Sequence, residues 1–214
     1  MTEKGRRVVL WRHGRTAWNA AGRMQGQLDP ALDDLGHRQA AAAAGVLATF
    51  RPAVLVTSDL TRATQTAQPL ARACGLAAIP DRRLREVDLG GWQGLTRAQV
   101  CEEFPAEYAA WRAGEDIRRG AGETYADAGG RGSAAVREWL ASVTDGGVLV
   151  AVTHGGTARA TAAALLELEP AAWWRFAPLG NCRWTVLVED PRGWRLLEHN
   201  AGDPPDDAVG DDAR

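Results

Sequence analysis

The stretch VVLWRHG at residues 8–14 joins a run of four apolar residues to an arginine, a histidine and a glycine. A short, continuous apolar run is typical of a strand that is buried on both faces of a largely parallel sheet. Two further runs of this kind lie at residues 53–56 and 148–152. The pattern therefore predicts three central strands, and the polar residues after each run are expected where the chain leaves the sheet.

Helical patterns separate these runs. Residues 35–50 and 60–73 have helical composition, with Asp59 placed to cap the second helix and Gly75 just past its end. An alanine-rich stretch at residues 156–168 follows the third apolar run. This alternation predicts an α/β fold, a three-layer α/β/α sandwich around a mostly parallel mixed sheet.

The rest of the chain adds a hairpin, a cap and a tail. Residues 184–189 and 194–198 flank an Asp-Pro-Arg-Gly turn and are expected to form antiparallel edge strands. Residues 96–140 are helical but contain glycines at 114, 120, 122, 129 and 130, which predicts an interrupted helical cap inserted in the domain. One domain is expected over residues 1–202, followed at 203–214 by an acidic disordered tail.

Composition favours a soluble, cytoplasmic protein. The 214 residues suit one domain with a sizeable core, and we find neither a signal peptide nor an apolar run long enough to span a membrane. Cys74, Cys101 and Cys182 are far apart, so we expect reduced structural thiols. Lys4 is the only lysine, and an arginine bias with abundant alanine and glycine is typical of a GC-rich genome. We therefore expect neither a nucleic-acid partner nor a membrane partner.

Polar residues that suit phosphate chemistry follow the predicted strands. Arg12 and His13 come after the first run, Arg62 after the second and His154 after the third. Ligands of such folds bind outside the carboxyl ends of the central strands, so these side chains are expected to converge. Guanidinium groups suit phosphate oxygens, and a neutral imidazole can attack phosphorus without a metal. A lone histidine at a strand end is more often structural, but two in equivalent positions favour a catalytic pair.

Glu86 lies in a loop, LREVDLG at residues 84–90. It is the candidate general acid for the leaving oxygen, and then the general base for the attacking water. An isolated glutamate in a loop is more often a solvated surface group, and only the neighbouring motifs favour the catalytic interpretation. The other two histidines, His37 and His199, are expected to face solvent or to pack.

These segments, in this order, resemble the histidine phosphatase superfamily, in the branch that contains cofactor-dependent phosphoglycerate mutases and many small-molecule phosphatases. The segments that carry the resemblance are Arg12-His13-Gly14, Trp18-Asn19, Ser58-Asp59-Leu60 with Ala63, Leu84-Arg85-Glu86 and Thr153-His154-Gly155. The resemblance implies a phosphohistidine on His13 and proton transfer by Glu86, with no metal and no cofactor. The phosphate pocket that it implies consists of Arg12, Arg62 and His154, with help from Asn19. Gly155 is a further candidate for binding the substrate.

Three loop segments favour one small phosphate ester as the substrate. Residues 22–29, 91–96 and 180–185 resemble loops of bacterial family members that hydrolyse glucosyl-3-phosphoglycerate, and Gln25 matches a residue of their substrate pocket. A broad-specificity phosphatase, a phosphoglycerate mutase, a phosphoprotein phosphatase and a non-catalytic phospho-ligand binding protein stay open as alternatives. The glycines after His154, where mutases tend to carry Asn-Ser, favour hydrolysis over the mutase reaction.

Several arginines and tryptophans have no assigned role in this scheme. Arg15 stands where relatives often carry Glu or Gln, and it either adds positive potential at the pocket mouth or points outward. Arg118 and Arg119 lie in the predicted cap. Most of the nine tryptophans are expected in the core, but the pair at 173 and 174 is a candidate subunit interface, which predicts a homodimer.

Overall fold

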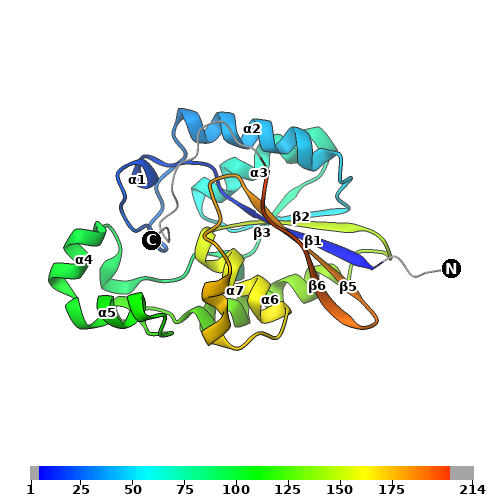
Figure 1. Cartoon of the computed structure of the whole chain (residues 1–214). Helices are drawn as coiled ribbons and strands as arrows, with labels where there is room; N and C mark the ends of the chain where they lie inside the picture. Colours follow the sequence, from blue (N-terminus) through cyan, green and yellow to red (C-terminus); the bar gives the residue numbers. More distant parts are fainter. Residues whose placement is uncertain (1–4, 203–214) are drawn as a thin grey trace.

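A computed structural model describes residues 5–202 of the chain (Figure 1). Its centre is a six-stranded sheet with the strand order β3-β2-β4-β1-β5-β6. The strands are β1 (Arg6–Arg12), β2 (Val54–Thr57), β3 (Ala78–Pro80), β4 (Val148–Thr153), β5 (Trp184–Asp190) and β6 (Gly193–Ala201). The first four are parallel, whereas β5 is antiparallel to β1 and β6 to β5. The predicted mixed sheet is confirmed, and the predicted tail at 203–214 lies outside the described residues.

Helices cover both faces of the sheet (Figure 1). Helices α2 (Asp34–Ala48) and α3 (Thr61–Cys74) pack on one face, and α6 (Tyr125–Leu140) and α7 (Gly155–Leu165) pack on the other. The shorter elements are α1 (Ala17–Ala20), α4 (Arg97–Glu103), α5 (Pro105–Ala113), η1 (Arg82–Leu84), η2 (Gly90–Trp92), η3 (Arg119–Ala121) and η4 (Pro170–Arg175). The three-layer α/β/α sandwich is therefore as predicted.

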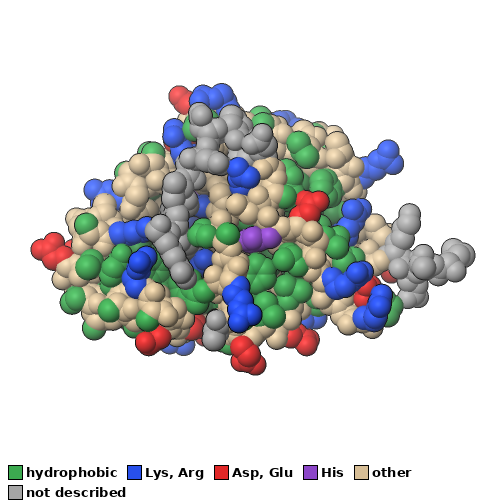
Figure 2. Space-filling view, viewed as in Figure 1, with side chains coloured by type: hydrophobic (Ala, Val, Ile, Leu, Met, Phe, Trp, Pro, Cys, Tyr) green, Lys and Arg blue, Asp and Glu red, His purple; other side chains and the backbone are tan. Residues whose placement is uncertain are grey.

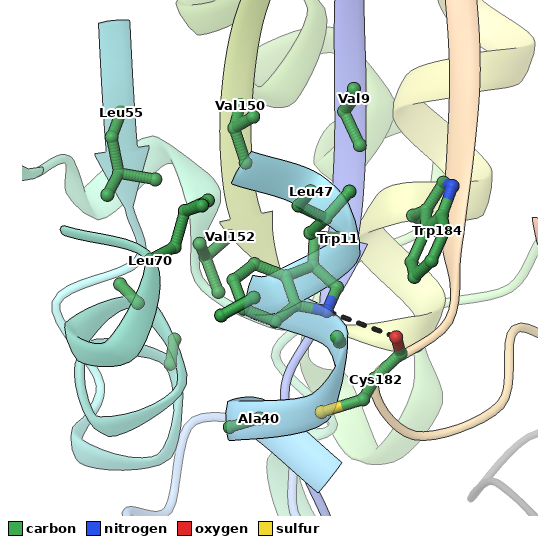
Figure 3. Close-up of a cluster of buried hydrophobic side chains, with 14 of the residues drawn as sticks. Val9, Trp11, Ala40, Leu47, Leu55, Leu70, Val150, Val152, Cys182 and Trp184 are labelled. Atoms are coloured by element: carbon green, nitrogen blue, oxygen red, sulfur yellow. Dashed lines mark hydrogen bonds between the residues drawn. The ribbon is translucent and has the colours of Figure 1, made fainter. Parts of the chain in front are cut away.

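Strand β1 divides its side chains between two cores, because successive residues of a strand point to opposite faces. Val9 and Trp11 pack in the cluster under α2 and α3, and Val8 and Leu10 pack in the cluster under α6 and α7. All four are fully buried, as the continuous apolar run predicts. Figure 3 shows the first cluster, where Nε1 of Trp11 donates to the carbonyl oxygen of Cys182 at 3.1 Å.

The start of α3 differs from the prediction. Its N-cap is Leu60, which makes no side-chain cap hydrogen bond. Asp59 instead forms an ion pair with Arg85, with 2.7 Å between Oδ2 and Nη2. The capping role expected for Asp59 is therefore wrong, because a guanidinium group from another loop takes its carboxylate. At the other end, Gly75 has a φ of 65° and ends the helix in the left-handed conformation, as predicted.

Helices α4 and α5 stand away from the sheet, at one end of the sandwich (Figure 1). A third apolar cluster joins them to the body, in which Trp111 of α5 packs with Ala160 of α7. Helix α6 also falls in the range predicted as a cap, but its Val136 and Leu140 pack in the core under the sheet. The helices of that range that project from the sandwich are therefore α4 and α5.

The tryptophan pair at 173 and 174 packs inside the chain. The ring centroid of Trp174 lies 6.1 Å from that of Trp111 and 5.9 Å from that of Tyr125. Its Nε1 donates to the carbonyl oxygen of Gly114 at 2.6 Å, and Trp173 is buried. Both rings pack against residues of the same chain, with Trp174 half-buried, and the homodimer stays a prediction.

The described surface mixes charges of both signs. On the face in Figure 2, basic side chains are scattered between acidic and hydrophobic ones, unlike the continuous basic stripe typical of a nucleic-acid site. Of residues 5–202, no helix has the length and apolar character that crossing a bilayer needs. The cysteines are free thiols, with Cys182 buried, Cys74 half-buried and Cys101 exposed.

Candidate active site

The carboxyl ends of β1, β4 and β2 meet at one edge of the sheet, because these strands are parallel neighbours. His13 follows β1 and His154 follows β4. Their ring centroids lie 5.1 Å apart, and both side chains are buried. The structure thus brings together the two histidines that the sequence placed at equivalent strand ends.

The ring of His13 is held in its neutral form. Its Nδ1 lies 2.7 Å from the carbonyl oxygen of Gly14. A carbonyl oxygen only accepts, so Nδ1 carries the proton and Nε2 keeps its lone pair. Burial, followed by the charges of Arg62 and Arg12, holds the pKa of His13 well below 6.5, although the Gly14 bond acts in the opposite direction. At neutral pH, Nε2 of this ring is therefore unprotonated.

The main chain around His13 is fixed by its neighbours. Its N–H donates to the carbonyl oxygen of Thr153 at 3.0 Å, and its carbonyl oxygen accepts from Nδ2 of Asn181 at 3.1 Å. Gly14 lies directly against α2, since a Cβ at this position would be 2.5 Å from the carbonyl oxygen of Gly36. This close approach is the physical reason for a glycine after His13.

Arg12 and Arg62 are buried beside the histidine pair. Nη1 of Arg12 donates to the carbonyl oxygen of Leu179 at 2.5 Å. Nη1 and Nη2 of Arg62 donate to the carbonyl oxygens of Leu28 and Gly26, both at 2.7 Å. These contacts orient the two guanidinium groups without removing their charge. The positive charges lower the pKa of both histidines, so their potential reaches the centre of the site.

His154 has one ring nitrogen bound and one open. Its Nε2 lies 2.9 Å from Oγ of Ser58, whereas its buried Nδ1 has no hydrogen-bond partner among residues 5–202. Burial first, and then the charge of Arg62, lower the pKa of this ring. Leaving a buried polar atom unpaired costs about 1–3 kcal/mol. A ligand with a polar group at Nδ1 would recover that free energy.

The side chain of Glu86 lies at the N-terminus of α7. Its Oε2 accepts from the N–H of Gly156 at 3.1 Å, and its Oε1 accepts from the N–H groups of Val87 and Thr157, both at 2.9 Å. These bonds place the carboxyl group of Glu86 at the N-terminal end of this helix. Glu86 is therefore fixed beside the residues that directly follow His154.

The predicted substrate-binding residues Asn19, Gln25 and Gly155 also lie near these groups. Asn19 and Gln25 are buried, and both contact Thr16. The Thr16 hydroxyl is 3.1 Å from Oε1 of Gln25, and the Thr16 N–H donates to Oδ1 of Asn19 at 3.1 Å. Gly155 begins α7, and a Cβ there would lie 3.4 Å from the guanidinium group of Arg12.

The structure assigns contacts to the three arginines that the sequence left open. Nε of Arg15 donates to Asp33 at 2.8 Å, which directs this side chain to the start of α2 and not to the pocket. Arg118 forms an exposed ion pair with an aspartate of α6. Arg119 is buried, with its guanidinium carbon 4.3 Å from the ring centroid of Tyr125.

Comparison with known proteins identifies the family of this chain. The sequence model of the histidine phosphatase superfamily (branch 1) matches residues 8–202. The chain belongs to the histidine phosphatase superfamily. The fold and the resemblance expected from the motifs at the strand ends are thereby confirmed.

Two histidine phosphatases with similar sequences are glucosyl-3-phosphoglycerate phosphatases. The one from Mycobacterium tuberculosis is 43% identical over 191 residues, which are 86% of each chain. The one from Mycolicibacterium vanbaalenii is 42% identical over 213 residues, which are 92% of this chain and 95% of the relative. A solved structure of a mycobacterial glucosyl-3-phosphoglycerate phosphatase with VO3 has a TM-score of 0.86 and 42% identity, and covers 92% of this chain and 100% of the other.

The other two histidines of this histidine phosphatase lie outside the site. His37 is exposed on α2. The ring nitrogens of His199 lie 2.9 Å from the Thr185 hydroxyl and 2.8 Å from the carbonyl oxygen of Ala177. Both assignments are as predicted. Within residues 5–202, no group of three or more His, Cys, Asp or Glu side chains is placed to hold a metal ion.

Sequence reasoning missed contacts that position the candidate catalytic groups. Ser58 and Asn181 lie in segments that carried the resemblance, and their places after β2 and before β5 are the signals that point to them. Thr157 and Arg131 contact the Glu86 segment from α7 and α6. No local pattern indicates these two residues, because the contacts depend on how helices pack against a loop.

Proposed function

We propose that this histidine phosphatase hydrolyses glucosyl-3-phosphoglycerate through a phosphohistidine on His13. The observation that supports the chemistry most directly is the bond from Nδ1 of His13 to the carbonyl oxygen of Gly14, which leaves Nε2 with its lone pair. The names of the two relatives, which are similar over most of the chain, support the substrate.

The first step forms the phosphohistidine. Arg12, Arg62 and Nδ1 of His154 bind the phosphoryl oxygens and neutralise their charge. Nε2 of His13 attacks phosphorus, so that an N–P bond forms while the P–O bond to the glycerate oxygen breaks. The leaving oxygen takes a proton from Glu86. Glucosylglycerate is released, and Glu86 is left as a carboxylate.

The second step returns the site to its starting state. Glu86 accepts a proton from a water molecule while the water oxygen attacks phosphorus. The N–P bond breaks, inorganic phosphate leaves, and His13 is again neutral with its lone pair on Nε2. The phosphoryl group is thereby transferred to water, and both catalytic residues are regenerated.

The proton of Glu86 is assigned to Oε2. Its Oε1 already accepts from two N–H groups and lies 3.2 Å from the Thr157 hydroxyl, whereas Oε2 accepts from one N–H group. An oxygen with several donors on its lone pairs has little room for a proton of its own. Oε2 is therefore the atom of Glu86 that faces the leaving oxygen and then the water.

The remaining predicted residues belong to the walls of the pocket in this proposal. Asn19 and Gly155 line the phosphate end beside Arg12. Gln25 contacts the glucosylglycerate part. Hydrolysis is preferred to the mutase reaction because Gly155 and Gly156 follow His154, and glycines add no side chain that could shield a phosphohistidine from water.

The test is to trap the phosphoenzyme. Glucosyl-3-phosphoglycerate with a radioactive phosphoryl group is mixed with the enzyme in the presence of a chelator and quenched within milliseconds. We expect an acid-labile, base-stable label on the wild type, and no label on His13→Ala, whose kcat/KM should fall by about 1,000-fold or more.

His37→Ala is the matched control, since it removes an exposed histidine outside the site and should keep both label and turnover. Label on His13→Ala, or turnover that disappears with the chelator, would contradict the mechanism. A panel with 3-phosphoglycerate and sugar phosphates tests the substrate. If one of these esters has a higher kcat/KM than glucosyl-3-phosphoglycerate, that ester is the preferred substrate and the proposed one is wrong.

A further inference from the structure

Arg131, in the first half of α6, binds the main chain of the segment that carries Glu86. Its Nη1 donates to the carbonyl oxygens of Arg83 at 2.7 Å and Arg85 at 2.6 Å, and its Nη2 donates to that of Glu86 at 2.9 Å. Its Nε and Nη2 also donate to the carboxylate of Glu123, at 2.9 and 2.7 Å. One guanidinium group thus joins three carbonyl oxygens of residues 83–86 to one acidic side chain.

Glu123 holds the same segment on the other side of Glu86. Its Oε2 accepts from the N–H of Asp88 at 2.9 Å, and its own N–H donates to the carbonyl oxygen of Asp88 at 2.8 Å. Burial acts to raise the pKa of Glu123, but the hydrogen bonds from Arg131 and Asp88 hold it below its ordinary value. The Glu123–Arg131 pair is therefore ionised at neutral pH. It hydrogen-bonds to the main chain before Glu86, through Arg131, and after it, through Glu123.

The Glu86 segment depends on such contacts because residues 86–89 belong to no helix or strand. The side chain of Glu86 is bound to the N–H groups at the start of α7, and its carbonyl oxygen is bound to Arg131 of α6. A misplacement of a catalytic group by about 1 Å can reduce a rate by about 100-fold. The position of Glu86 is therefore fixed by two helices of one layer, through its side chain and its main chain.

We propose that Arg131, together with Glu123, is a positioning residue that holds Glu86 in place for proton transfer. This inference rests on the acid role of Glu86 in the proposed function. No step of that reaction gives Arg131 a contact with the substrate, so its proposed effect on proton transfer passes through Glu86. Its charge also contributes to the lowered pKa of His154. The alternative is a purely structural clamp, whose loss would affect every substrate alike.

The test compares two substrates of similar shape that differ in leaving group. Phenyl phosphate leaves as a basic oxyanion that needs a proton, whereas p-nitrophenyl phosphate leaves readily without one. For Arg131→Met we expect kcat/KM to fall by about 10- to 100-fold with phenyl phosphate and by less than about threefold with p-nitrophenyl phosphate. Arg137→Met, an exposed arginine on the same helix, removes the same charge and should change neither value.

A double-mutant cycle with Glu86→Gln shows whether the two residues act as a unit. We expect Glu86→Gln to have the same selective loss, and Glu86→Gln/Arg131→Met to be within about twofold of Glu86→Gln alone. Equal losses on both substrates for Arg131→Met, or losses that multiply in the double variant, would overturn the positioning role.

The failures of the two proposals are distinguishable. If Glu86→Gln loses activity equally with phenyl phosphate and p-nitrophenyl phosphate, the acid role of Glu86 is wrong, and so is the positioning role of Arg131. If Glu86→Gln is selective and Arg131→Met is not, only the positioning role is overturned. If circular dichroism shows that Arg131→Met does not fold, Glu123→Gln replaces it. That change weakens the same hydrogen bonds to the loop and is expected to show the same selective loss.

Discussion

The two histidines of the site stay neutral at pH values where a free histidine becomes charged. Burial, followed by the charge of Arg62, lowers the pKa of His13 and of His154 from 6.5. In the unfolded chain both rings titrate near the ordinary value. Above pH 6.5 both states are neutral, but below it the unfolded chain binds protons that the folded chain does not. The folded state therefore loses stability as the pH falls.

We expect the free energy of unfolding, measured with urea in phosphate-free buffer, to decrease from about pH 6.5 towards about pH 5 by up to about 1.4 kcal/mol per pH unit for each histidine. His154→Gln should remove one of the two contributions to this slope. His37→Gln is the control for the loss of an imidazole, because that ring is exposed and lies outside the site. An equal slope in the wild type and in His154→Gln would contradict the neutral state assigned to His154.

Single residues were predictable as chemical types at strand ends, but their hydrogen-bond partners were not. His13, His154, Arg12 and Arg62 could be proposed because each comes at or after the end of a buried run. Asp59 has the right place for an N-cap, yet Nε and Nη2 of Arg85 both donate to its carboxylate at 2.7 Å. A two-bond contact with a guanidinium group is stronger than one cap bond, and local spacing does not reveal it.

Among the elements, the start of α7 has the most direct connection with the chemistry, because it binds the Glu86 carboxylate. A Cβ at Gly156 would lie 2.9 Å from Oε1 of Glu86 and 3.0 Å from a methyl group of Val87. We expect Gly156→Ala to displace the carboxylate and to lower kcat/KM for glucosyl-3-phosphoglycerate by about 10- to 100-fold. Steady-state kinetics measures this loss.

Gly130→Ala is the matched control on α6. Its added methyl group meets no atom within 4 Å. We expect this variant to keep kcat/KM and to gain about 0.5–1 kcal/mol in the free energy of unfolding, since alanine is a better helix former than glycine. Full activity in Gly156→Ala would show that Glu86 tolerates displacement, against the role proposed for its position.

The elements themselves were predictable where burial makes a continuous pattern, as in β1, β2 and β4. Strand β3 was missed because it has three residues, ends in a proline, and exposes Ile79. The glycines at 129 and 130 predict an interruption, yet α6 continues through them. A Cβ at Gly129 would lie 2.8 Å from the carbonyl oxygen of Ala160, so there the small residue lets α6 pack closely on α7. Sequence alone does not separate a helix break from a close helix contact.

The whole molecule has one apolar core on each face of the sheet. The core residues stabilise the fold, whereas the residues of the candidate site lie at the ends of the strands. Leu47 of α2 is fully buried in the first core. We expect Leu47→Ala to lower the free energy of unfolding by about 2–5 kcal/mol, because it leaves a cavity. The kcat/KM of the folded enzyme should not change, as Leu47 packs in the apolar core of one face and not at the strand ends that carry the site.

Val46→Ala is the control for this prediction, because Val46 is the preceding residue of α2 and is 49% exposed. We expect its effect to stay within about 0.5 kcal/mol. Urea denaturation with kinetics at low denaturant measures both quantities. A loss of kcat/KM in Leu47→Ala that matches the loss of stability would show that the core and the site are coupled.

The central place of β1 has a consequence for partial unfolding. The strand that ends at His13 is hydrogen-bonded to β4 on one side and to β5 on the other, so exposing it requires two ladders to separate at once. The loop of Glu86 is held by side chains and can open by itself. We therefore expect fluctuations of the native chain to detach Glu86 before His13, and to leave intermediates that keep the phosphate-binding groups proposed above but lack the proposed proton donor.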